Sequence, residues 1–357
     1  MKRFFVFLGV VLAAIGSAAS AQEVDSMVPM QKSSWGDAKT SETTSYIPEV
    51  SLDMRGGYSQ DFTNGTGRIF GDGLYLNIDG YISPNFSYSF NHRLASTYYE
   101  DNTGFNGTNW LTLTYEVGSF SFTAGKDALF VGSFEYDAYD LDAYFEMNSP
   151  FYNAFDCWQW GASAAFYPDD DHELIIQACN SPLSFGEPNL FAYALGWRGE
   201  MEFFESYWTA NLWQYDAGSY LKSLNLGNRF SFDDFSVDLE YMTRAADLKN
   251  MFKTDFTLMV APSYEFADWG CIRGKFGWEK CGEDELMEYG YDGSYMFYGL
   301  AAEFFPVPDY EDLRLHASWG HGCNRSHILN IGVTWKFSLT QTVKDIVSKC
   351  RTNRANL

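Results

Sequence analysis

The sequence lacks long hydrophobic runs. After residue 21, no apolar stretch of the 357-residue chain approaches the roughly 18 residues that a membrane-spanning helix needs. Basic residues are scarce as well: Lys and Arg number 24 against 47 Asp and Glu, which gives a formal net charge of −23. This balance argues against a nucleic-acid partner, because phosphate contacts need clustered Lys and Arg. The six cysteines include no CxxC pair, so a structural zinc site is not expected.

Aromatic residues are abundant instead. They make up 18 % of the chain, while the mean hydropathy is only −0.26. A chain this rich in aromatics is not expected to be disordered. The combination favours strands that turn one face to lipid and the other to water.

The N-terminus has the layout of a secretory signal peptide. Lys2 and Arg3 precede an apolar stretch from Phe4 to Ile15, and small residues end at Ala21. We therefore predict a signal peptide over residues 1–21, a flexible Ser/Thr-rich leader over 22–48, a barrel over 49–338 and a periplasmic tail over 339–357, with a short helix in the tail. Export permits disulfides, and Cys281 and Cys323 lie in neighbouring predicted loops where they could pair.

From Glu49 onward, apolar and polar residues alternate with a period of two, which is the signature of two-faced strands. The alternation predicts sixteen strands, near 49–59, 73–83, 85–95, 109–117, 119–126, 157–167, 172–180, 190–200, 203–214, 221–232, 235–244, 254–266, 270–280, 294–305, 312–320 and 327–337. An antiparallel ring closes with both ends on one side only if the count is even. The predicted fold is an all-β, sixteen-stranded antiparallel transmembrane β-barrel.

Links and charges agree with this prediction. Short and long links alternate strictly, as in outer-membrane barrels, with Phe62–Asp72 and Asp216–Tyr220 among the long ones. The apolar register is expected to hold no charged residue, whereas the opposite register holds many. Large barrels enclose channels, so we interpret the charged register as a watery lumen. Pro262 falls inside the twelfth strand and predicts a local break, because proline cannot donate to the ladder.

The third long link, Lys126–Asp156, is acidic and rich in Tyr and Phe, and residues 127–156 hold no Lys or Arg. We expect it to fold into the lumen and form a charged constriction, since such constrictions select ions; a solvated acidic loop outside the barrel is the alternative. The predicted acidic constriction residues are Glu135, Asp137, Asp140, Asp142 and Glu146. The predicted lumen-facing basic residues are Arg55, Arg93, Arg198, Arg229, Arg244, Arg273, Lys275 and Arg314.

Two resemblances to known proteins support the predicted outer-membrane barrel. The last strand alternates from Leu329 to Phe337 and resembles the C-terminal signal read by the barrel-assembly machinery of Gram-negative outer membranes. The stretches Gly125-Lys126, Gly132-Ser133-Phe134-Glu135-Tyr136-Asp137 and Asn180-Ser181-Pro182 are similar to the phosphate-selective porin O/P family of Bacteroidetes-type bacteria. That resemblance implies a homotrimer and passive diffusion of small solutes. Phosphate-selective members line the pore with arginines and lysines, whereas here acids are interleaved with them, so weak cation preference or poor selectivity is an equal alternative.

The sequence therefore predicts a porin in the cell outer membrane, a passive diffusion channel for small hydrophilic solutes or ions. The alternatives are a plugged barrel that serves as a surface scaffold or adhesin, and a substrate-specific transporter. We expect no enzymatic activity, because none of the five histidines has a nucleophile at a spacing that indicates a catalytic pair. No cofactor and no metal are expected.

Overall fold

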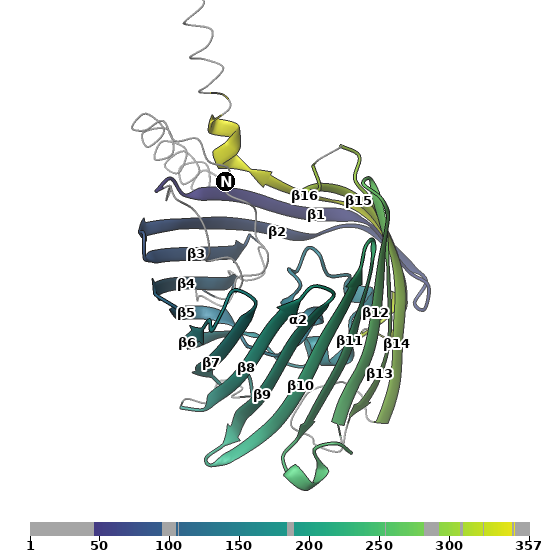
Figure 1. Ribbon diagram of the computed structural model, residues 1–357. Coiled ribbons are helices and arrows are strands. Elements are labelled where there is room, and N and C mark those ends of the chain that lie inside the picture. The colour runs from purple at the N-terminus through teal and green to yellow at the C-terminus, as the bar shows by residue number, and fades with distance from the viewer. Residues whose placement is uncertain are drawn as a thin grey trace, which may run out of the picture.

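The computed structural model describes residues 46–94, 105, 107–183, 189–253, 255–281, 293–307, 310–323, 325–344 and 346. The predicted signal peptide and most of the predicted leader lie outside the described residues. Sixteen strands close into one barrel (Figure 1), in which β1 (Glu49–Asp61) pairs with β16 (His327–Ser338). Each pairing between neighbours is antiparallel, so the predicted sixteen-stranded antiparallel barrel is confirmed. No helix within the described part of the chain is long and apolar enough to cross a membrane.

The other strands are β2 (Thr66–Ser83), β3 (Phe86–Arg93), β4 (Thr108–Val117), β5 (Phe120–Ala128), β6 (Trp158–Phe166), β7 (His172–Asn180), β8 (Phe191–Met201), β9 (Phe204–Asp216), β10 (Ser219–Phe232), β11 (Phe235–Ala245), β12 (Asp255–Ala267), β13 (Gly270–Cys281), β14 (Gly293–Phe304) and β15 (Leu313–His321). Four short helices interrupt the links: α2 (Phe134–Asp137), η2 (Phe145–Met147), η3 (Pro150–Asn153) and η4 (Leu248–Asn250). We call the edge that carries the β5–β6 link the loop end, and the edge where β1 begins and β16 ends the turn end.

Strand β7 shows why these sequences form two-faced strands. Ile175 and Gln177 are buried on the inner face, whereas the alternate residues Leu174 and Ile176 are 40 % and 57 % exposed on the outer face. Successive side chains of a strand point to opposite sides, so the outer face of the ring is mainly apolar and the inner face carries most of the polar and charged residues. The core of this molecule is the barrel interior.

The expectation that the outer register carries no charge is wrong at three lysines. Lys126, Lys222 and Lys280 continue the outward-facing rows of β5, β10 and β13, each near the loop end. Their ammonium groups donate to the backbone carbonyls of Phe105, at 3.2 Å, of Tyr220, at 3.1 Å, and of Lys253, at 2.7 Å. A lysine at the rim can direct its charge away from the apolar band, which explains why these positions tolerate it.

The strict alternation of short and long links is wrong at two places. Residues 66–72, predicted as part of a link, belong to β2, and only 62–65 form the turn. The Asp61 carboxylate accepts the backbone N–H groups of Thr63, at 2.8 Å, and Asn64, at 3.0 Å, while Gly65 has φ +67°. This turn chemistry outweighs the polar composition of the segment. Between β9 and β10 the turn is only Ala217-Gly218, where glycine supplies φ +77°.

The predicted break at Pro262 is present. Pairing of β12 with β13 runs from Val260↔Phe276 to Ser263↔Arg273 and omits Ala261 and Pro262. The predicted pairing of Cys281 with Cys323 is wrong: these thiols donate to the carbonyls of Gly293 and Phe145.

The chain continues as a helix over residues 339–344 after the last strand. The Thr340 hydroxyl accepts from the backbone N–H of Val50 and donates to the carbonyl of Pro48, each at 2.9 Å. These two hydrogen bonds dock the helix on the start of β1, beside the β1–β16 junction.

Candidate functional site

The link between β5 and β6 occupies the barrel interior. Its residues 129–157, which we call the inner segment, include α2, η2 and η3, and Figure 1 shows α2 within the ring. Hydrogen bonds join the inner segment to inward side chains of β2, β9, β13 and β15, for example at Tyr75, Thr209, Lys275 and Ser318. Contacts with walls that face each other require the segment to cross the space between them.

Apolar packing holds both limbs of the inner segment against β7 to β11. Leu129, Val131 and Phe151 form a buried cluster with Trp213 of β9 and Met242 of β11. Burying side chains of this size stabilises by roughly 1.5–3 kcal/mol each, which far exceeds what a solvated loop would gain.

A close approach at β8 fixes where the outgoing limb lies. The Phe130 ring packs on Tyr207, with ring centroids 4.9 Å apart, and lies directly over Gly196 of β8. A Cβ at position 196 would clash with the Phe130 ring. Glycine is therefore required there for the limb to reach the wall.

Glu135 connects the two limbs of the inner segment to β13. One oxygen accepts from Lys275 Nζ at 2.8 Å and from the backbone N–H of Ser149 at 2.9 Å, and the other accepts from the Ser149 hydroxyl at 2.5 Å. Lys275 also donates to the Asn148 side chain at 3.0 Å. Both ends of the stretch 136–147 are thus held at one point of the wall.

The other predicted acids also contact the wall. Asp137 accepts from Arg198 at 3.0 Å, and Asp140 accepts from the Tyr75 hydroxyl at 2.9 Å. Asp142 lies 2.6 Å from Arg314 and 3.1 Å from Lys336. Glu146 is buried and accepts from Ser318 and from Asn330. The carboxylates therefore hold the inner segment to the wall, in place of facing basic residues across an open gap.

Burial and neighbouring charge act against each other at two of these carboxylates. Burial raises the pKa of Asp140, although the Tyr75 hydroxyl and Arg93 act in the opposite direction. Burial also disfavours the charge on Asp142, but Arg314 and Lys336 outweigh it and hold the pKa of Asp142 below its ordinary value.

The eight predicted basic residues divide into three groups. Arg198, Lys275 and Arg314 pair with acids of the inner segment, and Arg55 donates to its backbone carbonyls at Leu141 and Ala143. Arg229, Arg244 and Arg273 pair with strand acids, namely Asp238, Glu279 and Glu303. Arg93 lies beside the Tyr75 ring, with Cζ 5.8 Å from its centroid.

Several wall residues that contact the inner segment are not among the predicted site residues. Lys336, Tyr75 and Glu303 each hold the inner segment, the last through a 2.6 Å hydrogen bond from Tyr144. Alternation in the strand sequences puts these residues in the polar register, and this signal could have singled them out. Their partners could not be read, because Tyr144 and Glu303 are 159 positions apart.

Solved structures with the same architecture are bacterial porins. A variant of the Rh. blastica porin matches with a TM-score of 0.54 over 82 % of this chain and 100 % of that chain, at 14 % sequence identity. A triple mutant of the Rhodopseudomonas blastica porin gives a TM-score of 0.53 with the same coverage and identity. The chain has a porin fold. A structure described as "Asymmetric conductivity of engineered proteins" also matches, with a TM-score of 0.53 at 13 % identity over 81 % of this chain and 100 % of that chain.

Comparisons at the level of sequence give no match. No family model matches it, and no curated protein matches it. At identities this low, the similarity to porins establishes the fold alone.

Proposed function

We propose that this protein is an outer-membrane porin, a channel for the passive diffusion of small hydrophilic solutes or ions. The single observation that carries the proposal is the sorting of side chains by face: large apolar residues such as Leu195 and Phe276, both 51 % exposed, cover the outside, whereas paired charges such as Arg229 and Asp238 lie inside. A lysine or arginine in mid-membrane on the lipid face costs about 2–4 kcal/mol. The sorting therefore suits a barrel surrounded by lipid with water within it.

Further properties belong to the same proposal. The chain is exported through its N-terminal signal peptide, is inserted by the barrel-assembly machinery, and forms a homotrimer that acts without a cofactor and is not an enzyme. Membership of the phosphate-selective porin O/P family rests on the short motifs around Gly132–Asp137 and Asn180–Pro182. Block of the conductance by phosphate would test that membership.

Single-channel recording in planar bilayers tests the proposal. A porin gives ohmic conductance steps when the purified chain from residue 22 onward is added. Current that a particular solute blocks would support a substrate-specific transporter in place of a general porin. A complete absence of steps, with the chain shown to be folded and inserted, would overturn the channel function.

A plugged barrel, serving as a surface scaffold or adhesin, is the second candidate. It is favoured by the reach of the inner segment, which contacts the walls at β1, β2, β9, β13, β15 and β16. The structure offers a direct test, because Glu135 and Asn148 meet at Lys275. Replacing residues 136–147 with a short Gly/Ser linker removes the crossing stretch and keeps both limbs. If only this variant conducts, the native barrel is plugged.

A further inference from the structure

The inner wall differs from one side of the barrel to the other. The inward register of β4 to β7 carries hydroxyl, amide and carboxyl side chains, including Thr114, Glu116, Thr123, Asp127, Gln159, Ser163 and Gln177, and no lysine or arginine. The lysine of this region, Lys126, belongs to the outward register and donates to the Phe105 carbonyl. The inward cations stand on other strands, for example Arg198 on β8, Lys275 on β13 and Arg314 on β15.

The inner segment lies against β7 to β11 and reaches the cations of β8, β13, β15 and β16. Its carboxylates pair with Arg198, Lys275, Arg314 and Lys336. Two of these cations retain little accessibility, since the side chains of Lys275 and Arg314 are 13 % and 9 % exposed. The charges that would attract anions are thus largely neutralised where the segment lies against the wall.

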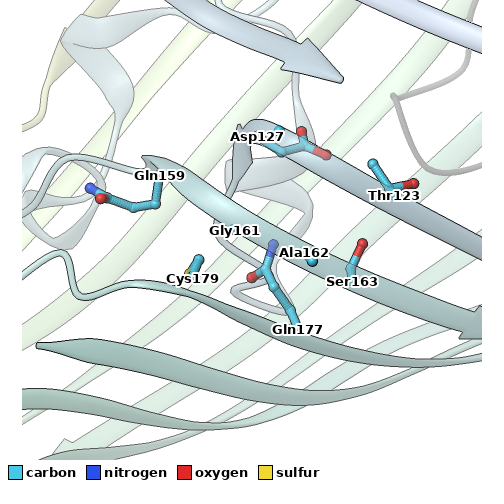
Figure 2. A pocket seen from close by; sticks show the side chains of 9 residues that line it. Thr123, Asp127, Gln159, Gly161, Ala162, Ser163, Gln177 and Cys179 are labelled. Atoms are coloured by element: carbon cyan, nitrogen blue, oxygen red, sulfur yellow. The ribbon is translucent and has the colours of Figure 1, made fainter. Parts of the chain in front are cut away.

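The inward faces of β4 to β6 keep partly exposed polar side chains. The polar strip is the name we give to six inward residues of these strands: Thr114, Glu116, Thr123, Asp127, Gln159 and Ser163. Each of these side chains is half-buried. Figure 2 shows Thr123, Asp127, Gln159 and Ser163 around a niche on β5 and β6 that Gly125 and Gly161 also line. Local hydrogen bonds hold the side chains of the strip: Thr114 bonds with Thr123 at 2.9 Å, Asp127 accepts from the N–H of Ala128, and Gln159 donates to the carbonyl of Asp156.

The two carboxylates stand at opposite ends of the strip. Glu116 pairs in register with Ser121 near the turn end, and Asp127 pairs with Gln159 near the loop end. Asp127 lies six positions after Ser121 on the extended strand, a span of about 20 Å. Hydroxyl groups and side-chain-free glycines occupy the stretch between them.

We propose that the polar strip lines the solute path, and that Asp127 and Glu116 make this path prefer small cations and uncharged hydroxylated solutes over small anions. The inference rests on the proposed channel function and names its solute class. A carboxylate at each end of a low-dielectric passage raises the local concentration of cations, and rings of such groups favour cations in pores. Hydroxyl and amide groups between them can replace the hydrogen bonds that a polyol loses on leaving water.

Reversal potentials in a KCl gradient test the electrostatic part. We expect the native channel to favour K⁺ over Cl⁻, and the double variant Asp127→Asn/Glu116→Gln to lower that permeability ratio at least twofold. Glu202→Gln is the matched control, because it removes one carboxylate from an exposed turn at the turn end without touching the strip, and it should leave the ratio unchanged. An anion-preferring native channel, or an unchanged ratio in the double variant, would overturn the proposal.

Chemical labelling tests the location of the path without any current. Thr123→Cys and Ser163→Cys place a thiol on the strip, and Ser318→Cys places one at a position that is 1 % exposed beneath Glu146. In liposomes, with mass spectrometry to locate the label, both strip thiols should react at least tenfold faster than the Ser318→Cys thiol. A cationic methanethiosulfonate reagent should also react faster than an anionic one.

The two readouts separate the two proposals. Labelling of the strip in a barrel that passes no current would contradict the channel function and leave the strip accessible as described. Current through a barrel whose strip thiols react no faster than the Ser318→Cys thiol would support the channel and overturn the strip as its path.

Discussion

Glu135 illustrates how single residues hold this interior together. Its carboxylate side chain is 1 % exposed and pairs with Lys275, whose side chain is 13 % exposed. Removing one partner of a buried ion pair leaves the other uncompensated and typically destabilises by about 3–5 kcal/mol. We therefore expect Glu135→Gln to lower the free energy of unfolding by an amount in that range, measured by urea titration in detergent micelles with tryptophan fluorescence as the probe.

The matched control is the double variant Glu135→Gln/Lys275→Met, which removes both charges. Because no buried charge is then left unpaired, this variant should regain a large part of the lost stability. A single variant as stable as the native chain would show that Glu135 does not hold the limbs together.

Gly196 makes the second prediction at this scale. Its Cα lies beneath the Phe130 ring, and an added methyl group would clash with it. Forcing an extra methyl into a packed interior costs about 1–3 kcal/mol, so Gly196→Ala should lower unfolding stability by that amount in the same titration. Gly71→Ala is the control, since a Cβ there would meet only the Arg55 carbonyl at 3.9 Å. Equal effects of the two substitutions would contradict the close approach.

Alternation of side chains determines which way each residue points, but it cannot tell which residue it meets. Lys275 and Arg198 stand in the polar register of their strands, as the sequence indicates. Their partners in the inner segment are 140 and 61 positions away. Such pairs depend on how the chain closes, and no local pattern encodes that.

At the scale of elements, strand positions follow directly from the sequence and turns follow less well. The predicted bounds of β7 equal those observed, because Leu174, Ile176 and Ala178 alternate with polar or inward residues over the whole strand. For the β1–β2 hairpin the sequence predicts too long a link, because residues 66–72 are mostly polar or glycine. Asp61 and Gly65 fix a tight turn there, and composition alone does not reveal it.

The inner segment yields the third prediction. The triple variant Asp137→Asn/Asp140→Asn/Asp142→Asn removes the acids of the inner segment that pair with Arg198, Arg314 and Lys336. Among the acids that the structure describes, Arg314 keeps only Glu303 as a partner, 3.6 Å away. The interior then carries unneutralised cations, so selectivity should shift toward anions. Reversal potentials in a salt gradient measure this, and no shift would show that the inner segment does not border the path.

The outer face of the barrel carries exposed apolar side chains on strands all around the ring. Exposed residues on the outer face include Ile176 at 57 %, Leu300 at 55 % and Leu195 at 51 %. A soluble monomer rarely shows such a surface over its whole girth. We expect the chain from residue 22 onward to stay dispersed in detergent and to sediment once the detergent is removed. Monodisperse protein in plain buffer would contradict a lipid-facing barrel.

At this scale the sequence predicts the strand number and the closed ring, because sixteen two-faced strands with the charges in one register fit an even-numbered antiparallel barrel. It does not predict which inward cations the inner segment covers. Closure of the ring brings Arg198 on β8, Lys275 on β13 and Arg314 on β15 to one segment, and no single strand sequence encodes that.

The pairing of β1 with β16 has a consequence for biogenesis. The first strand to be synthesised has its permanent neighbour at the far end of the chain, from Ser51↔Ser338 to Asp61↔Ile328. Until that neighbour arrives, both margins of the nascent sheet expose unpaired backbone groups that invite aggregation. Contacts so distant in sequence form slowly. The unfolded polypeptide therefore needs a chaperone from its synthesis until β1 pairs with β16.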